Sequence, residues 1–223
     1  MPQDKILVRF NIKNTKYAVH NGNGTFSTPV PIGFSDSIAL ESNYAEKIIY
    51  GDGRAVLTIP NDKGKTGTLG LLTIDNDYEI AMKRRMKTAN GTAEIKQSAA
   101  IEHALYFETD YMEEDGEIKT AKTIVYGVTS GRPSETYSQT TEDINNNNVS
   151  YPLTIKGIKM KNSDGSTDYK DDKGNIVYAW QETCLPGDAG YDTFGEAITA
   201  PKAPASAAQA AQTTSTQADP LAF

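Results

Sequence analysis

Apolar and polar residues alternate with a period of two along most of this chain. The clearest case is the segment 6–12, in which every second residue is Ile, Val or Phe and most of the residues between them are polar or charged. Successive side chains of an extended strand point to opposite faces, so this pattern is typical of a strand with one buried face. The segment 6–12 is therefore predicted to be a half-buried β-strand.

The same alternation predicts a series of short strands separated by turns rich in Gly, Asn and Asp. They are expected at 15–19, 38–40, 48–50, 56–59, 68–74, 103–111, 122–128, 151–155 and 176–180. Polar turns are expected at 21–24, 61–65, 113–116, 145–148 and 164–174. Many short strands without intervening long helices favour a mainly β fold, an antiparallel β-sandwich or partial barrel with one flanking α-helix.

One helix is predicted, beginning near residue 76. Asn76 is followed three residues later by Glu, which is the spacing of a capping box with an Asn N-cap. Tyr78, Met82 and Met86 then recur at four-residue spacing and would form one apolar stripe. The helix is expected to end before the Asn-Gly pair at 90–91.

Length and composition indicate one β domain followed by a polar tail. The chain has 223 residues, and its Ala-, Gln- and Thr-rich end predicts a division into a domain at 1–196 and a C-terminal tail at 197–223. The tail is not expected to build a core. It ends with the apolar residues Leu221 and Phe223, which are candidates for docking into a groove of a neighbouring subunit.

The composition offers little catalytic chemistry. Cys184 is the single cysteine, so an internal disulfide is excluded. Cys184 could act as a nucleophile with His103 as its base, but the sequence around it has no oxyanion-loop signature. The segment 162–173 has alternating oxygen ligands but lacks the Gly and Glu of an EF-hand loop, so a solvated hairpin loop is the better interpretation. The glycine pairs in 51–53 and 64–67 read as hairpin turns, because neither fits a phosphate-binding loop. No cofactor, metal or enzymatic activity is predicted.

Charge and hydropathy limit the kinds of partner that the chain is expected to bind. The formal net charge of −7 argues against wrapping a nucleic-acid backbone, and the basic run 83–87 is interpreted as a solvated helix face or a set of partner-facing ion pairs. The start of the chain has no apolar stretch typical of a signal peptide, and no run is long enough to span a membrane. We therefore expect synthesis in the cytoplasm and no membrane contact.

The order of motifs in the first sixty residues resembles that of major tail proteins from phages with long, flexible, non-contractile tails. The motifs are an aromatic-x-Ile-Lys-Asn strand at 10–14, Tyr-Ala at 17–18, Pro-x-Pro-Ile-Gly at 29–33 and Tyr-Gly-Asp-Gly at 50–53. None of them is specific alone, and their order and spacing carry the resemblance. The resemblance covers roughly the first 160 residues when the motifs are aligned in order.

The resemblance implies a structural role and a homo-oligomeric state. Such proteins fold as two packed antiparallel sheets with a flanking helix, form six-membered rings and stack into a tail tube, through which DNA passes along an electronegative lumen without specific binding. It further implies tape measure, tail terminator and distal tail proteins as partners. The expected location is the virion tail, after synthesis in the bacterial host cytoplasm.

The resemblance also points to an inter-ring loop. In the family a long hairpin loop reaches into the adjacent ring, and the matching stretch here is 51–67. The candidate residues of this loop are its charged residues and Asn61: Asp52, Arg54, Asn61, Asp62, Lys63 and Lys65. The sequence pattern places the tip of this loop at 61–65.

Two other classes remain open from the sequence. A secreted or surface β-sandwich that binds carbohydrate or protein is the main alternative, although the chain has only one Trp. A small β-fold hydrolase is the other, and it would depend on Cys184. Residues 1–9 do not resemble an export signal, which argues against the secreted protein. The chain has few residues suited to catalysis, which argues against the hydrolase.

Overall fold

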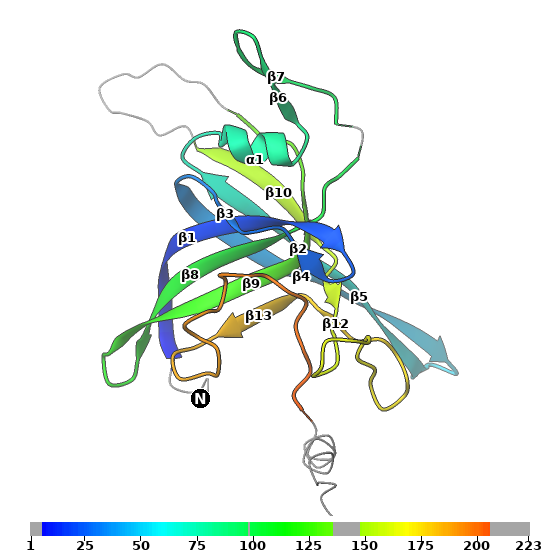
Figure 1. Cartoon of the computed structure of the whole chain (residues 1–223). Coiled ribbons are helices and arrows are strands. Elements are labelled where there is room, and N and C mark those ends of the chain that lie inside the picture. Colours follow the sequence, from blue (N-terminus) through cyan, green and yellow to red (C-terminus); the bar gives the residue numbers. More distant parts are fainter. Residues whose placement is uncertain (1–5, 98, 136–147, 206–223) are drawn as a thin grey trace, which may run out of the picture.

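The computed structural model describes residues 6–97, 99–135 and 148–205, and within these ranges the fold is mainly β (Figure 1). The strands are β1 (Ile6–Gly22), β2 (Thr25–Phe26), β3 (Val30–Pro31), β4 (Ser35–Gly51), β5 (Arg54–Leu71), β6 (Arg85–Thr88), β7 (Gly91–Glu94), β8 (His103–Glu113), β9 (Ile118–Ser130), β10 (Val149–Ile155), β11 (Ile158–Lys159), β12 (Tyr178–Ala179) and β13 (Gln181–Cys184). The one helix is α1 (Asn76–Ala81). The predicted fold class is confirmed.

One antiparallel sheet forms the body. Its strands follow the order β2-β1-β8-β9-β10-β5-β4, with β3 paired to β1 and β13 paired to β9. The sheet curls until its two ends approach each other, and the hydroxyl oxygens of Thr15 on β1 and Ser35 on β4 lie 2.6 Å apart. The curled sheet is the predicted partial barrel, and it encloses a core.

The first core cluster fills the interior of the curled sheet. Its buried members are Tyr17, Ile32, Leu69, Leu71, Tyr78, Met82, Leu105, Phe107, Val125, Val128, Val149, Tyr151, Leu153 and Ile155. Tyr78 belongs to α1 and Met82 follows directly after it, so the helix closes one end of the barrel (Figure 1). Alternating residues of the neighbouring strands supply the rest, as period-two patterning requires.

The second cluster lies on the outer face of β8 and β9. There Tyr106 and Tyr126 pack with Ile198 and Ala200, which are 3% and 4% exposed. The C-terminal segment therefore covers the sheet, and both faces of β8 and β9 are buried. The expectation that nothing from residue 197 onward contributes to a core is wrong for these residues, because Ile198 and Ala200 pack in this cluster with Tyr106 and Tyr126.

The helix is shorter than its apolar stripe predicted. Asp75 is the N-cap, one residue before the predicted Asn76, and its side chain accepts hydrogen bonds from the backbone N–H groups of Asp77 and Tyr78. The chain leaves the helix after Ala81 and forms the β6–β7 hairpin, in which Met86 is 49% exposed. Lys83, with φ of 55°, makes the left-handed turn that ends the helical path.

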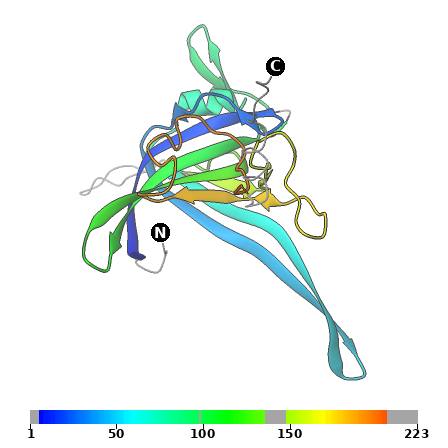
Figure 2. The same cartoon turned by 60° about the horizontal axis from the view of Figure 1, so that its bottom comes forward.

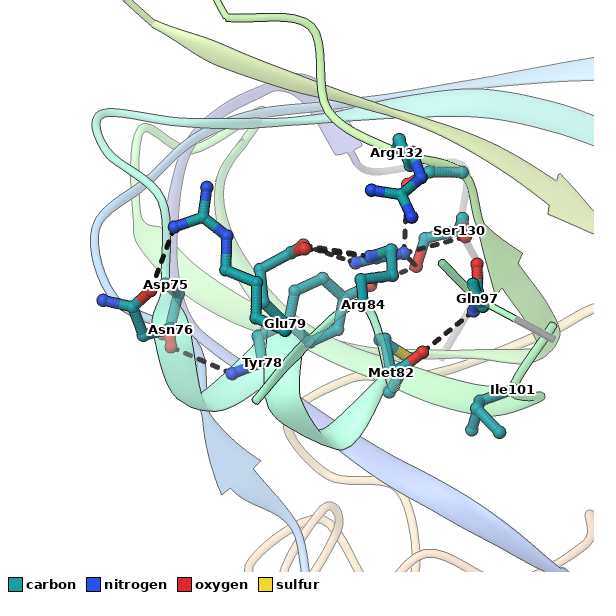
Figure 3. Close-up of polar contacts among 12 residues, drawn as sticks. Asp75, Asn76, Tyr78, Glu79, Met82, Arg84, Gln97, Ile101, Ser130 and Arg132 are labelled. Atoms are coloured by element: carbon teal, nitrogen blue, oxygen red, sulfur yellow. Dashed lines mark hydrogen bonds and ion pairs between the residues drawn. The ribbon is translucent and has the colours of Figure 1, made fainter. Parts of the chain in front are cut away.

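A buried ion pair explains why the helix stops there (Figure 3). Arg84 is fully buried and binds Glu79 through Nε and Nη2, with a shortest distance of 2.7 Å. Its Nη1 donates to the carbonyl oxygens of Ser130 and Gly131 and to the Ser130 hydroxyl. The prediction that the basic run is a solvated or partner-facing helix surface is wrong for Arg84, because the side chain turns inward to pair with Glu79. A continuing helix would not bring the two together in this way.

Tyr78 and His103 complete this buried cluster. The Tyr78 hydroxyl lies 2.8 Å from Ser130 Oγ and 3.1 Å from His103 Nε2, and the Arg84 guanidinium lies 5.4 Å from the Tyr78 ring centroid. Burial raises the pKa of Tyr78 to about 12 and lowers the pKa of His103 to about 4. The groups are paired with one another, so the cluster anchors α1 to β8 and β9.

Candidate assembly site

A two-stranded arm extends from the body (Figure 2). Strands β4 and β5 pair along their whole length, from Ser35↔Leu71 to Gly51↔Arg54. The next strand, β10, pairs with β5 only between Lys65 and Leu71. Beyond that point β4 and β5 pair, among the described strands, only with each other. We call residues 44–62 the arm. At about 3.3 Å per residue the arm is roughly 25 Å long.

The arm turns at Asp52 and Gly53. Both residues have positive φ, 50° and 75°, as a two-residue hairpin turn requires. The 51–53 stretch is therefore a hairpin turn, as predicted. The predicted tip at 61–65 and the turn at 64–67 are wrong, because these residues belong to strand β5, which stays paired with β4 on both sides of a register shift. Their Gly and Asn residues suggested a turn, whereas the ladder accommodates them with a bulge.

The arm exposes large apolar side chains on both of its faces. They are Tyr44, Ile48, Ile49, Tyr50, Val56 and Leu57, each between 41% and 68% exposed. Directly paired residues share a face, so Ile49 and Leu57 lie on one side, while Tyr44 and Ile48 lie on the other. A two-stranded ribbon cannot bury either face by itself.

A close contact fixes the arm to the body. The register shifts between Ser42 and Tyr44, and opposite this shift Gly64 adopts φ of 91°. A Cβ at Gly64 would lie 2.5 Å from the Ile155 carbonyl oxygen and 2.9 Å from Cζ3 of Trp180. The bulge therefore needs glycine, both for its backbone conformation and for the close approach of the indole ring.

The residues predicted for an inter-ring loop fall in two places. Asp52 and Arg54 lie at the turn of the arm, whereas Asn61, Asp62, Lys63 and Lys65 lie on β5 where the arm joins the body. The structure therefore does not bring the six residues together. Leu221 and Phe223, predicted for tail docking, lie outside the described residues.

Charged residues are interspersed among the apolar ones of the arm. Lys47 and Arg54 are exposed. The Tyr44 hydroxyl donates to Glu46 at 2.8 Å, and this hydrogen bond to a carboxylate raises the pKa of Tyr44. Glu46 and Asp52 are exposed as well, so the arm offers apolar side chains among charges of both signs.

The candidate catalytic pair is not assembled. Cys184 pairs with Lys122 and His103 pairs with Val128, six residues further along β9. At about 3.3 Å per residue the two lie roughly 20 Å apart. Burial is also the main cause that raises the pKa of the Cys184 thiol, which disfavours the nucleophilic thiolate.

The acidic segments form hydrogen-bonded turns. At the β8–β9 turn Lys119 pairs with Glu113 at 2.8 Å and with Glu117 at 3.1 Å. In the loop at 162–173, Asp168 pairs with Lys159 and Lys161. Both segments are charged turns, as the sequence predicted. None of the described helices is long and apolar enough to cross a membrane.

Sequence reasoning missed the apolar residues of the arm. Ile48, Ile49 and Tyr50 follow one another, and so do Val56 and Leu57, so each strand carries apolar side chains on both faces. This pattern usually marks a strand buried on both sides, and here it lies outside the body. The runs of adjacent apolar residues on both sides of an Asp-Gly turn could have indicated this surface.

Comparisons with known proteins give only distant similarity. No protein-family model matches the sequence, and the search of curated proteins found no match. A chain of the anti-feeding prophage baseplate is similar with 7% identity and a TM-score of 0.38, covering 80% of this chain and 95% of that one. A chain of the anti-feeding prophage tube terminating cap is similar with 12% identity and a TM-score of 0.37, covering 83% and 98%.

Proposed function

We propose that this protein is a structural subunit that polymerises as stacked rings into a phage tail tube. The observation that carries the proposal is the arm, which exposes apolar side chains on both faces. Burial of the arm by other subunits would stabilise the assembly, because full burial of one such side chain contributes about 1.5–3 kcal/mol to the free energy of association. Contiguous exposed apolar surface of this kind marks an interaction site.

The unpaired edges of the arm support the same function. Among the described strands β4 pairs only with β5, and the part of β5 beyond Lys65 has no second neighbour. Exposed edges are templates for pairing with another chain, which natural proteins otherwise block. Strand pairing with another subunit, within a ring or between rings, would satisfy these backbone groups.

The tube would be a conduit for DNA. The proposal includes hexameric rings, tape measure, tail terminator and distal tail proteins as partners, and a location in the virion tail. The net charge of −7 suits a lumen that DNA crosses without binding, because a basic channel would retain it. In this proposal the protein has no catalytic role, in accord with the separation of Cys184 from His103.

Substitutions in the arm test the function. Ile49→Thr with Leu57→Thr keeps β-forming residues at an exposed, directly paired position, so the subunit should fold as the wild type does. Sedimentation velocity at increasing concentration should show polymers for the wild type and monomers for this variant. Ile176→Thr with Tyr178→Thr is the matched control, since these side chains are also exposed but lie outside the arm. Normal polymers from the arm variant would contradict the proposal.

A further inference from the structure

One end of the β8–β9 ladder carries apolar side chains on a bare sheet face. Val8 on β1 is directly paired with Met112 on β8, and Met112 is directly paired with Ile118 on β9. Directly paired residues share a face, so the three side chains form a row, which Phe10 extends along β1. All four are between 36% and 58% exposed, whereas Tyr111 on the opposite face is buried. We call these four residues the apolar row.

The turn between β8 and β9 gives the apolar row an acidic border. Four of the five residues at 113–117 are Glu or Asp, the densest acidic stretch of the chain. The segments 8–10 and 112–119 together hold four carboxylates against two cations, Arg9 and Lys119. Lys119 is already bound to two of the carboxylates, at 2.8 and 3.1 Å. Glu114 and Asp115 are exposed and have no ion-pair partner among the described residues.

The β6–β7 hairpin carries the opposite charge. Four of the five residues at 83–87 are Lys or Arg, the densest basic stretch of the chain. Arg84 and Arg85 are paired with carboxylates of the same chain. Lys83, Lys87 and Lys96 are exposed, and the described part of the chain offers them no ion-pair partner. Three cations of the hairpin are therefore free to meet a partner.

The same hairpin also presents an apolar side chain. Met86 is 49% exposed and is directly paired with Ala93, so the two lie on one face of the hairpin. The single carboxylate within 83–96, Glu94, is bound to Arg132. The hairpin thus combines an exposed methionine with unpaired cations, which complements an apolar row with an acidic border.

The two surfaces lie at opposite ends of the body (Figures 1 and 2). Arg84, at the base of the hairpin, donates to the carbonyl oxygen of Ser130, which ends β9. Ile118, in the apolar row, begins β9. At about 3.3 Å per residue these ends of β9 are roughly 40 Å apart. The hairpin of a chain therefore does not cover the apolar row of the same chain.

We infer that the apolar row, with its acidic border, is the docking surface for the β6–β7 hairpin of a second copy. The inference rests on the proposed function and names a contact between successive subunits of the polymer. Charge selects this occupant over the arm, because residues 44–62 hold three carboxylates and only two cations. Donor and acceptor are different surfaces, so the contact is head-to-tail, and its repetition leads to an open polymer.

Charge reversal tests the occupant. Lys87→Glu with Lys96→Glu should raise the critical concentration for polymerisation, measured by sedimentation, at least about tenfold, because like charges then face each other. Glu114→Lys with Asp115→Asn should do the same, and the chain carrying all four substitutions should recover most of the loss.

A matched control reverses the same number of charges elsewhere. Lys170→Glu with Lys173→Glu, on an exposed loop, should leave the critical concentration within about twofold. A hairpin variant that polymerises as well as this control, or a fourfold variant without recovery, would overturn the inference.

Cross-linking tests the contact itself. Met86→Cys with Met112→Cys places one thiol on the hairpin and one in the apolar row. Polymers of this variant, treated with a short bismaleimide, should give a series of covalent oligomers in denaturing electrophoresis, whereas either single variant should give monomers. The single variants also control for reaction at Cys184, which is buried.

The outcomes separate this contact from the proposed function. Polymers of the double-cysteine variant that yield no covalent oligomers would overturn the inference and leave the arm as the assembly element. A wild-type chain that does not polymerise would instead refute the proposed function, on which the inference rests.

Discussion

The indole ring of Trp180 lies against Gly64, where the arm joins the body, so closely that a Cβ at Gly64 would lie 2.9 Å from Cζ3. Trp180 itself packs against the first core cluster. At its base, where β4 and β5 enter the body, the arm thus contacts the barrel through one glycine and one aromatic ring. This contact sets the direction in which the arm leaves the body, because it fixes the bulge in β5.

Gly64→Ala should therefore destabilise the subunit. The substitution forces a left-handed backbone on Ala and places a methyl group against the Ile155 carbonyl oxygen and the indole, for an expected loss of about 2–4 kcal/mol. Gly174→Ala is the control, since its φ is 82° but its Cβ would meet nothing within 4 Å. That variant should lose about 1–2 kcal/mol. Urea unfolding measures both, and equal losses would show that the Trp180 contact is unimportant.

Arg84→Met should be among the most damaging single substitutions. It leaves the Glu79 carboxylate, which is 2% exposed, without its partner, and breaking a buried pair in this way costs about 3–5 kcal/mol. The double variant Glu79→Met with Arg84→Met should recover much of the loss, because no uncompensated charge remains. Denaturant unfolding of the three chains tests this. A loss below about 1 kcal/mol in the single variant would contradict the structural role of the pair.

His103 should make the subunit less stable in mild acid. Burial lowers its pKa from 6.5 to about 4, so between these values the unfolded chain binds a proton that the folded chain does not. Stability should be unaffected by this group above about pH 6.5 and should fall as the pH is lowered toward 4, by about 3 kcal/mol in total. The groups facing the ring are the Tyr78 hydroxyl, the Ile101 carbonyl and the Arg84 guanidinium.

The comparison with His103→Gln isolates this effect. Urea unfolding at pH 7 and pH 5 should show a smaller drop in stability for the variant than for the wild type, because most carboxylates remain ionised over this interval. Equal drops for the two proteins would mean that His103 is not the titrating group.

Two truncations should behave differently at the C-terminal end. Ending the chain after Ala205 removes only residues whose composition predicts no core, so the melting temperature should hardly change. Ending it after Ala197 also removes Ile198 and Ala200 from the second core cluster and should cost about 2–4 kcal/mol. Thermal unfolding followed by circular dichroism distinguishes the two. A similar melting temperature for both would show that the covering segment adds no stability.

Local patterning predicted the strands of the body well, because alternation reports directly on a half-buried face. It failed for the helix, because Arg84 bonds the carbonyl oxygen of Ser130, 46 residues away, and this contact overrides the apolar stripe that ends in Met86. A stripe of three residues cannot reveal such a distant partner.

The arm was only half predictable. The Asp52-Gly53 turn follows from its residues, and so do the strands on either side of it. That the strands leave the body depends on β10 ending its pairing at Lys65, opposite Ile155, which is a long-range property. The sequence therefore located polar residues at the turn of the arm, Asp52 and Arg54, but not the apolar side chains that form its surface.

Electron microscopy of the concentrated, purified full-length protein tests the central claim most directly. The account predicts rings or hollow tubes in negative stain for the wild type, and only isolated subunits for the Ile49→Thr, Leu57→Thr variant at the same concentration. A wild-type protein that stays monomeric at every concentration, also when tail-initiator proteins are added, would contradict the claim that the arm is an assembly element.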